Sequence, residues 1–119
     1  MNNHTNNHKY ERIEAEIKKE LQKLIIYGVK DLRVSGNVNI IDVKVSKDLS
    51  YAKIYVEVLD EKNKKEILLG LQNAKGYMKR ELAININLRK TPDLNFIIDD
   101  TKEKAKHIEE IINKIHSSQ

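Results

Sequence analysis

The sequence predicts a small α+β domain in which helices cover one face of a single three-stranded sheet. Stretches with apolar residues three and four positions apart, typical of helices, are interspersed with stretches where apolar and polar residues alternate, typical of strands. One short polar turn joins two of the alternating stretches, which favours an antiparallel hairpin. The chain has 119 residues, enough for one domain with its own apolar core.

The first helix is expected to begin near residue 10 and to stop before Gly28. Its apolar positions recur at spacings of four, four and three and therefore share one face; they are Ile13, Ile17, Leu21 and Leu24. Residues 1–9 are polar and lack the apolar segment of a signal peptide, so we expect a disordered leader there.

Two strands follow, over residues 37–46 and 51–59, joined by a turn at residues 47–50. The side chains expected to face the core in the first strand are Ile41, Val43 and Val45. Those expected to face it in the second strand are Ala52, Ile54, Val56 and Val58. The short turn makes the pair an antiparallel hairpin.

The next helical pattern covers residues 60–74 and resumes at residues 77–88. Its core stripe is Ile67, Leu68, Leu71, Met78, Leu82 and Ile86. Gly70 is expected to allow close packing. Pro92 disfavours a helical conformation at Thr91 and so ends the helical region.

The interruption between these two stretches is Gly76. A glycine inside a helix costs about 1 kcal/mol relative to alanine, so we expect two helices that meet at a joint of small residues, Ala74-Lys75-Gly76. A second helix that began here would expose unpaired backbone N–H groups and the positive end of its dipole. Both features suit a phosphate group.

The last two elements are a strand over residues 94–99 and a helix over residues 100–116. The strand places Leu94, Phe96 and Ile98 on one face, and the helix carries an apolar stripe of Ala105, Ile108, Ile112 and Ile115. We therefore expect one domain over residues 10–116, followed by a short tail at residues 117–119.

Composition permits a polyanionic partner without requiring one. The net charge is +4 and the pI is near 9.2. Aromatic residues make up only 5% of the chain, so base stacking on an aromatic platform is not expected to be the main mode of binding. The absence of cysteine excludes disulfides and thiolate metal sites and fits a reducing cytoplasm. No apolar run approaches the roughly 20 residues that span a bilayer.

Cations around the joint predict a phosphate-binding surface, since lysine attracts phosphate and arginine can also bind it through two hydrogen bonds. The candidate contacts are Ala74, Lys75, Gly76, Lys79, Arg80, Arg89 and Lys90, with Lys44 and Lys47 near the hairpin as secondary candidates. Spacing alone leaves an alternative open, in which Gly76 is a helix cap or a packing contact and the lysines form a solvated face.

Catalytic motifs are missing from the sequence: there is no recognisable Ser/His/Asp arrangement, P-loop or HExxH motif. The adjacent Asp99 and Asp100 are interpreted as favourable charges at a helix start. We expect no catalytic residue, no metal site and no cofactor.

The order of elements and three longer motifs resemble the ribosome-binding factor A family, which has a fold like that of type II KH domains. KH domains carry a GxxG loop at the joint, where this chain has the Ala-x-Gly kink of residues 74–76. The motifs are DVKVSKDLSYAKIYVEVL for the hairpin, LQNAKGYMKREL for the kinked helix and LRKTPDLNFIIDDT for the passage into the last strand. The resemblance extends from Tyr10 to His116.

This resemblance implies a non-catalytic factor that binds the free 30S ribosomal subunit, and its 16S rRNA, late in maturation. It further implies assistance of 5′-end processing of the 16S rRNA precursor, growth in the cold and release coupled to assembly GTPases. A cytoplasmic monomer without membrane contact is expected.

One departure from the family pattern is Asp31-Leu32-Arg33, where the family often has Asp-Pro-Arg. It predicts a less rigid loop. The alternative left open is a KH-like or BolA-like protein-interaction module whose basic face binds an acidic protein.

Overall fold

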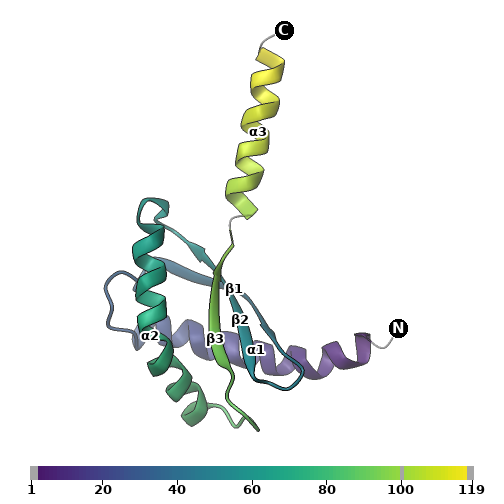
Figure 1. Ribbon diagram of the computed structural model, residues 1–119, viewed down its shortest axis with the longest axis vertical. Helices are drawn as coiled ribbons and strands as arrows, with labels where there is room; N and C mark the ends of the chain where they lie inside the picture. The colour runs from purple at the N-terminus through teal and green to yellow at the C-terminus, as the bar shows by residue number, and fades with distance from the viewer. Residues whose placement is uncertain (1–2, 100, 118–119) are drawn as a thin grey trace.

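A computed structural model describes residues 3–99 and 101–117 of the chain (Figure 1). Its elements, in order, are α1 (Asn3–Tyr27), β1 (Val38–Val45), β2 (Tyr51–Val58), the 3-10 helix η1 (Glu61–Asn63), α2 (Lys64–Asn85), β3 (Asp93–Ile98) and α3 (Thr101–Ser117). The predicted α+β class, with one three-stranded sheet and a C-terminal helix, is confirmed. Helix α1 starts inside the segment expected to be a disordered leader, and the domain division at residue 9 stays a prediction.

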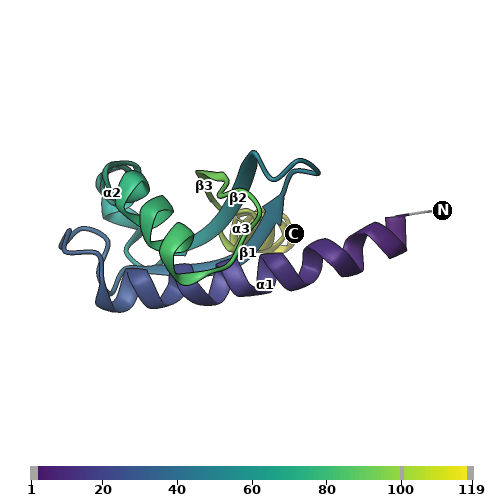
Figure 2. The ribbon, with the colours of Figure 1, turned by 90° about the horizontal axis from the view of Figure 1, so that it is seen from below.

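The sheet has the order β1-β2-β3, with β2 in the centre. β1 and β2 are antiparallel, as the short turn predicts, whereas β2 and β3 are parallel and start together, with Tyr51 opposite Asp93. Parallel neighbours need a crossover connection, which η1 and α2 supply. Helix α1 packs against β1 and α2 against β3, so both helices cover one face of the sheet (Figures 1 and 2).

A β-bulge in β1 corrects one prediction about the core. Pairing with β2 passes from Ile40 opposite Val56 to Asp42 opposite Tyr55, so Ile41 is an extra residue. A bulge reverses the alternation on one side of it. Ile40 is therefore buried, whereas Ile41 is 37% exposed and does not face the core as expected.

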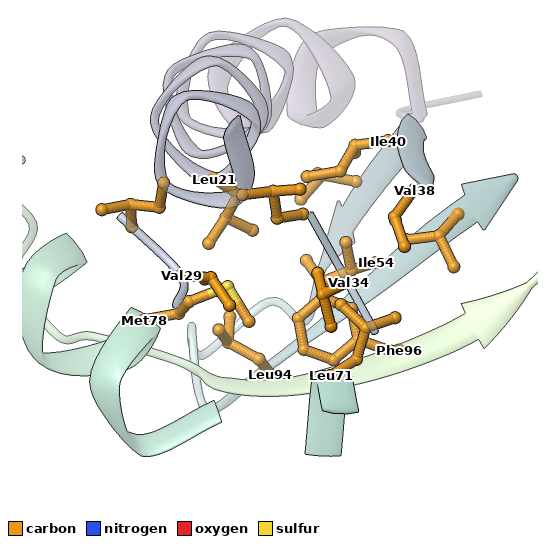
Figure 3. Close-up of a cluster of buried hydrophobic side chains, with 14 of the residues drawn as sticks. Leu21, Val29, Val34, Val38, Ile40, Ile54, Leu71, Met78, Leu94 and Phe96 are labelled. Atoms are coloured by element: carbon orange, nitrogen blue, oxygen red, sulfur yellow. The ribbon is translucent and has the colours of Figure 1, made fainter. Parts of the chain in front are cut away.

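The core lies between the helices and the sheet and is built from aliphatic side chains and one phenylalanine (Figure 3). Leu21 of α1, Ile54 of β2, Leu71 and Met78 of α2 and Phe96 of β3 all contribute to it. Among the described residues, no polar or charged side chain is buried. Burying one such aliphatic side chain contributes about 1.5–3 kcal/mol, so this contiguous cluster holds the two helices on the sheet.

The two helices expected on either side of Gly76 form one continuous helix, α2. The halves of α2 are not collinear (Figure 1), but the helix does not break, and it supplies no new N-terminus at residues 74–76. The interpretation of Gly76 as a helix cap is wrong because α2 continues to Asn85. Its interpretation as a packing contact is wrong because a Cβ placed there would meet no atom within 4 Å. Gly70 does allow close packing, since a Cβ there would lie 2.8 Å from Cγ2 of Val34.

The C-terminal helix α3 points away from the rest of the domain (Figure 1). Side chains are described for its residues 107–116, and all of these are exposed. The expected apolar stripe is present at Ile108, Ile112 and Ile115 but is not part of the core. Asp100 and the side chain of Ala105 lie outside the described residues.

Candidate nucleic-acid interface

Three of the predicted cations surround one carboxylate at the start of β3. Lys79 Nζ lies 2.6 Å from Asp93 Oδ1. This hydrogen bond, with the charges of Lys79, Lys90 and Lys75, holds the pKa of Asp93 below its usual range. Lys75 and Lys79 are four residues apart and so share one face of α2. The folded chain therefore brings cations from α2 and from the α2–β3 connection together around a single negative charge.

The turn between β1 and β2 lies next to this cluster. Lys90 Nζ donates a hydrogen bond to Ser50 Oγ at 2.9 Å, and the backbone N–H of Asp93 donates to the carbonyl of Ser50 at 2.9 Å. Within the turn, the Asp48 carboxylate accepts hydrogen bonds from the hydroxyls of Ser46 and Ser50, both at 2.8 Å, and from the Ser50 backbone N–H.

These hydrogen bonds, above all those from Ser50, lower the pKa of Asp48 to about 2. Asp48 is thus satisfied mainly by neutral groups of the turn. The carboxylate of Asp48 therefore does not need an ion pair with Lys47, the residue before it in the chain.

Helix α1, the hairpin turn and residues 87–90 enclose a groove of about 760 Å³, which we call the basic groove. The hydroxyl of Tyr10 donates to the carbonyl of Lys47 at 2.8 Å and so ties α1 to the turn. The cations of the groove are Lys9, Arg12, Lys47, Arg89 and Lys90, its carboxylates are Glu16 and Asp48, and its other lining residues are Tyr10, Ile13, Leu49, Asn87 and Leu88. Five cations against two carboxylates make this groove electropositive.

The remaining predicted residues do not line this groove. Lys44 is exposed on β1, 3.9 Å from Asp42, and is paired in the sheet with Lys53. Gly76 and Arg80 are both exposed on α2, one turn apart. Ala74 is half-buried and packs against the core.

Two groove cations, Lys9 and Arg12, are absent from the sequence-based set. They lie at the start of the apolar pattern, where a disordered leader was expected to give way to the helix. The signal that could have found them is helical spacing: residues 9, 12 and 16 are three and four apart and fall on one face once α1 extends upstream.

The order of elements and the parallel pairing of β3 with β2 define a small KH-like α+β domain, and the basic groove gives it an electropositive surface. The chain belongs to the ribosome-binding factor A family, whose model matches residues 9–112. A curated relative, ribosome-binding factor A of Finegoldia magna, is 45% identical over 107 residues, which cover 88% of each chain.

Solved structures agree with this assignment. The crystal structure of ribosome-binding factor A from Thermus thermophilus is similar, with a TM-score of 0.67 and 28% identity over 74% of this chain and 93% of that one. A homology model of the Thermus thermophilus factor, fitted into a cryo-electron-microscopy map of a 30S complex, has a TM-score of 0.60, with 28% identity over 74% of this chain and 92% of that one. Within the described part of the present chain, no helix is both long and apolar enough to cross a membrane.

Proposed function

We propose that this protein is a non-catalytic ribosome assembly factor that binds the free 30S subunit, through its 16S rRNA, late in maturation. The observation that carries the proposal is the basic groove, in which Lys47, Arg89 and Lys90 are joined by Lys9 and Arg12. Family membership and the 30S complex of the Thermus thermophilus factor support it.

The cations divide into two groups according to their partners. Among the described residues, Lys47 and Arg89 form no ion pair, so their charge is available to phosphate groups. Lys79 is held by Asp93, so we propose a smaller contribution from it. Displacement of counterions from phosphates supplies the binding free energy of such contacts and makes the affinity dependent on salt.

Gly76 and Arg80 form a second surface, on α2, at which RNA could contact the protein. Open space around Gly76 lets a sugar–phosphate backbone come close to the helix, and Arg80 lies one turn further along the same exposed face. This contact replaces the helix-terminus mechanism, which the continuity of α2 excludes.

The finer parts of the proposal rest on the family resemblance. They are assistance of 5′-end processing of the 16S rRNA precursor, a role in growth in the cold, assembly GTPases as partners in release, and action as a cytoplasmic monomer without a cofactor.

Co-sedimentation with purified ribosomal particles at low and moderate salt tests the central proposal. We expect the protein to travel with free 30S subunits and not with 70S ribosomes, and to be released as salt rises. The double variant Lys47→Glu/Arg89→Glu should sediment less, whereas Lys62→Glu in η1, at the other end of the sheet, should behave as the wild type. A protein that stays at the top of the gradient even at low salt would overturn the proposal, and capture of an acidic protein without rRNA would favour the interaction-module alternative.

A further inference from the structure

The basic groove has an apolar interior that phosphate binding does not explain. Tyr10, Ile13, Leu49 and Leu88 line it between the cations. A duplex presents phosphates and groove edges to a protein, whereas an unpaired nucleotide also presents the apolar faces of its base. The groove volume of about 760 Å³ falls within the roughly 300–1,000 Å³ range of sites for small organic molecules.

Leu49 provides an independent observation on the same groove. Its φ is 59°, and it is the single non-glycine residue with positive φ in the described part of the chain. A branched side chain is disfavoured in this left-handed conformation, where glycine or asparagine is usual. The backbone N–H of Leu49 donates to the carbonyl of Ser46 at 3.0 Å, a contact that a glycine would make equally well.

The side chain of Leu49 does not serve the core. Leu49 is half-buried, yet it is not among the described apolar residues that pack against the core, whereas its groove neighbours Ile13 and Leu88 are. Leu49 instead lines the groove. Strain of this kind gathers at binding sites, and here it places an apolar side chain beside the cations.

Tyr10 is fixed in position on the α1 side of the groove. The hydrogen bond from its hydroxyl to the carbonyl of Lys47 holds the ring between α1 and the turn. Lys9 Nζ lies 5.9 Å from the centre of the ring. An immobilised aromatic ring next to cations is the arrangement on which bases of single strands stack.

We propose that the basic groove binds one unpaired nucleotide of an RNA strand, with the base against Tyr10 and Leu49 and the flanking phosphates on Lys47 and Arg89. This inference rests on the proposed function, because it names the form of RNA that the groove accepts. None of the groove residues belongs to the Ala74–Gly76 segment, so the groove is a contact additional to the exposed face of α2.

The test uses the full-length protein and three RNA probes that carry equal numbers of phosphates per strand. They are a nine-nucleotide single strand with a central 2-aminopurine, the same strand with an abasic site at that position, and the first strand in a duplex. Stacking of one base on a protein changes affinity by about five- to 150-fold. We expect the intact single strand to bind at least about fivefold more tightly than the abasic strand, with a change in 2-aminopurine fluorescence.

Single substitutions distinguish the contribution of the base contacts to affinity from that of the phosphate contacts. Leu49→Gly relieves the backbone strain and removes one of the two side chains proposed to contact the base. It should therefore keep or raise the melting temperature while the difference in affinity between intact and abasic strands narrows. Arg89→Glu should weaken the binding of the intact strand and of the abasic strand by the same factor. Leu32→Gly, which removes a leucine that is 87% exposed in the α1–β1 loop, is the matched control and should leave both affinities unchanged.

Two results would overturn the inference: equal affinity for intact and abasic strands, or preference for the duplex. Either result, combined with normal co-sedimentation of the protein with 30S subunits, would leave the proposed function standing. Loss of binding to all three probes together with loss of co-sedimentation would reject both proposals.

Discussion

The two ends of the sheet differ in what satisfies their carboxylates: a cation at one end and neutral hydrogen-bond donors at the other. At the loop end, between α1 and β1, Arg33 donates to both carboxylate oxygens of Asp31, from Nη2 to Oδ2 at 2.7 Å and from Nε to Oδ1 at 3.0 Å, and lies 3.6 Å from Glu66 of α2. At the turn end, the carboxylate of Asp48 is satisfied mainly by serine groups. Asp31 and Asp48 both have a pKa lowered to about 2, the first chiefly by Arg33 and the second chiefly by Ser50.

This difference distinguishes cations that hold the fold from cations that are free to bind. Arg33 is engaged with two carboxylates, so its charge is compensated within the chain. Lys47 and Arg89 have no such partner among the described residues. A cation count alone would rank the three residues equally, whereas their partners assign them different roles.

The largest expected effect concerns packing at the loop end. Gly70→Val should destabilise the protein by about 1–3 kcal/mol, the usual cost of overpacking, because its Cβ would press on buried Val34. Gly76→Ala in the same helix meets no atom and should stabilise it by up to about 1 kcal/mol through helix propensity. Chemical denaturation measures both, and destabilisation by Gly76→Ala would show that this position is constrained in the fold.

At the turn end, the double variant Lys47→Glu/Arg89→Glu should weaken binding to 30S subunits about tenfold or more at moderate salt. Each lost phosphate contact also lowers the slope of log affinity against log salt by about 0.7–0.9. A salt titration of binding measures both quantities. The melting temperature should stay unchanged. A large fall in it would show that Lys47 and Arg89 also stabilise the fold, as Arg33 does at the other end of the sheet.

The converse result is expected for Arg33→Ala. Losing Arg33 leaves Asp31 and Glu66 without their shared partner, so the melting temperature should fall while 30S affinity is retained. Thermal unfolding and co-sedimentation of the same preparation check this. Weakened binding by a folded Arg33→Ala protein would contradict the structural role assigned to this cation.

Lowering the pH should remove the stability contributed by Asp31 and by Asp48 to the same extent. Raising the salt concentration should instead change their two pKa values by different amounts. Because the pKa of each is about 2 in the folded protein and near 3.8 otherwise, each contributes stability that is present above pH 4 and is lost as the pH falls towards 2. High salt screens an exposed ion pair, so it should raise the pKa of Asp31 more than that of Asp48, which rests on neutral hydrogen bonds. NMR titrations of the two carboxyl groups at two salt concentrations make this comparison. Equal changes in the two pKa values would mean that the charge of Lys90, and not the serine hydrogen bonds, is the main cause of the low pKa of Asp48.

Much of the fold follows from local patterns, and the deviations have identifiable causes. Alternation predicts β2 correctly, but β1 contains two adjacent isoleucines, and only pairing with β2 decides that Ile40 faces the core and Ile41 is the bulge. Helix propensity alone favours an interruption at Gly76. Burial of Met78 and Leu82 with Ile67 and Leu71 outweighs the roughly 1 kcal/mol cost of this glycine, and the helix continues.

The candidate site is only partly readable from the sequence for a similar reason. Lys47, Arg89 and Lys90 can be proposed from their neighbours in the chain, but a groove depends on which segments meet in space. Lys9 and Arg12 join it because α1 begins upstream of its apolar stripe and Tyr10 reaches the turn. The role of Asp93 in holding Lys79 likewise depends on β3 pairing in parallel with β2.

The parallel pairing of β2 and β3 also has a consequence for the order of folding. The β1–β2 hairpin closes a short loop and should form quickly, whereas pairing of β3 closes a much longer segment that includes α2 and is expected to come later. Residues 87–90 reach the turn only when β3 docks and the N–H of Asp93 bonds to Ser50. A chain with a formed hairpin but an undocked β3 therefore lacks the groove, so we expect the affinity proposed for the groove to be acquired only when β3 docks.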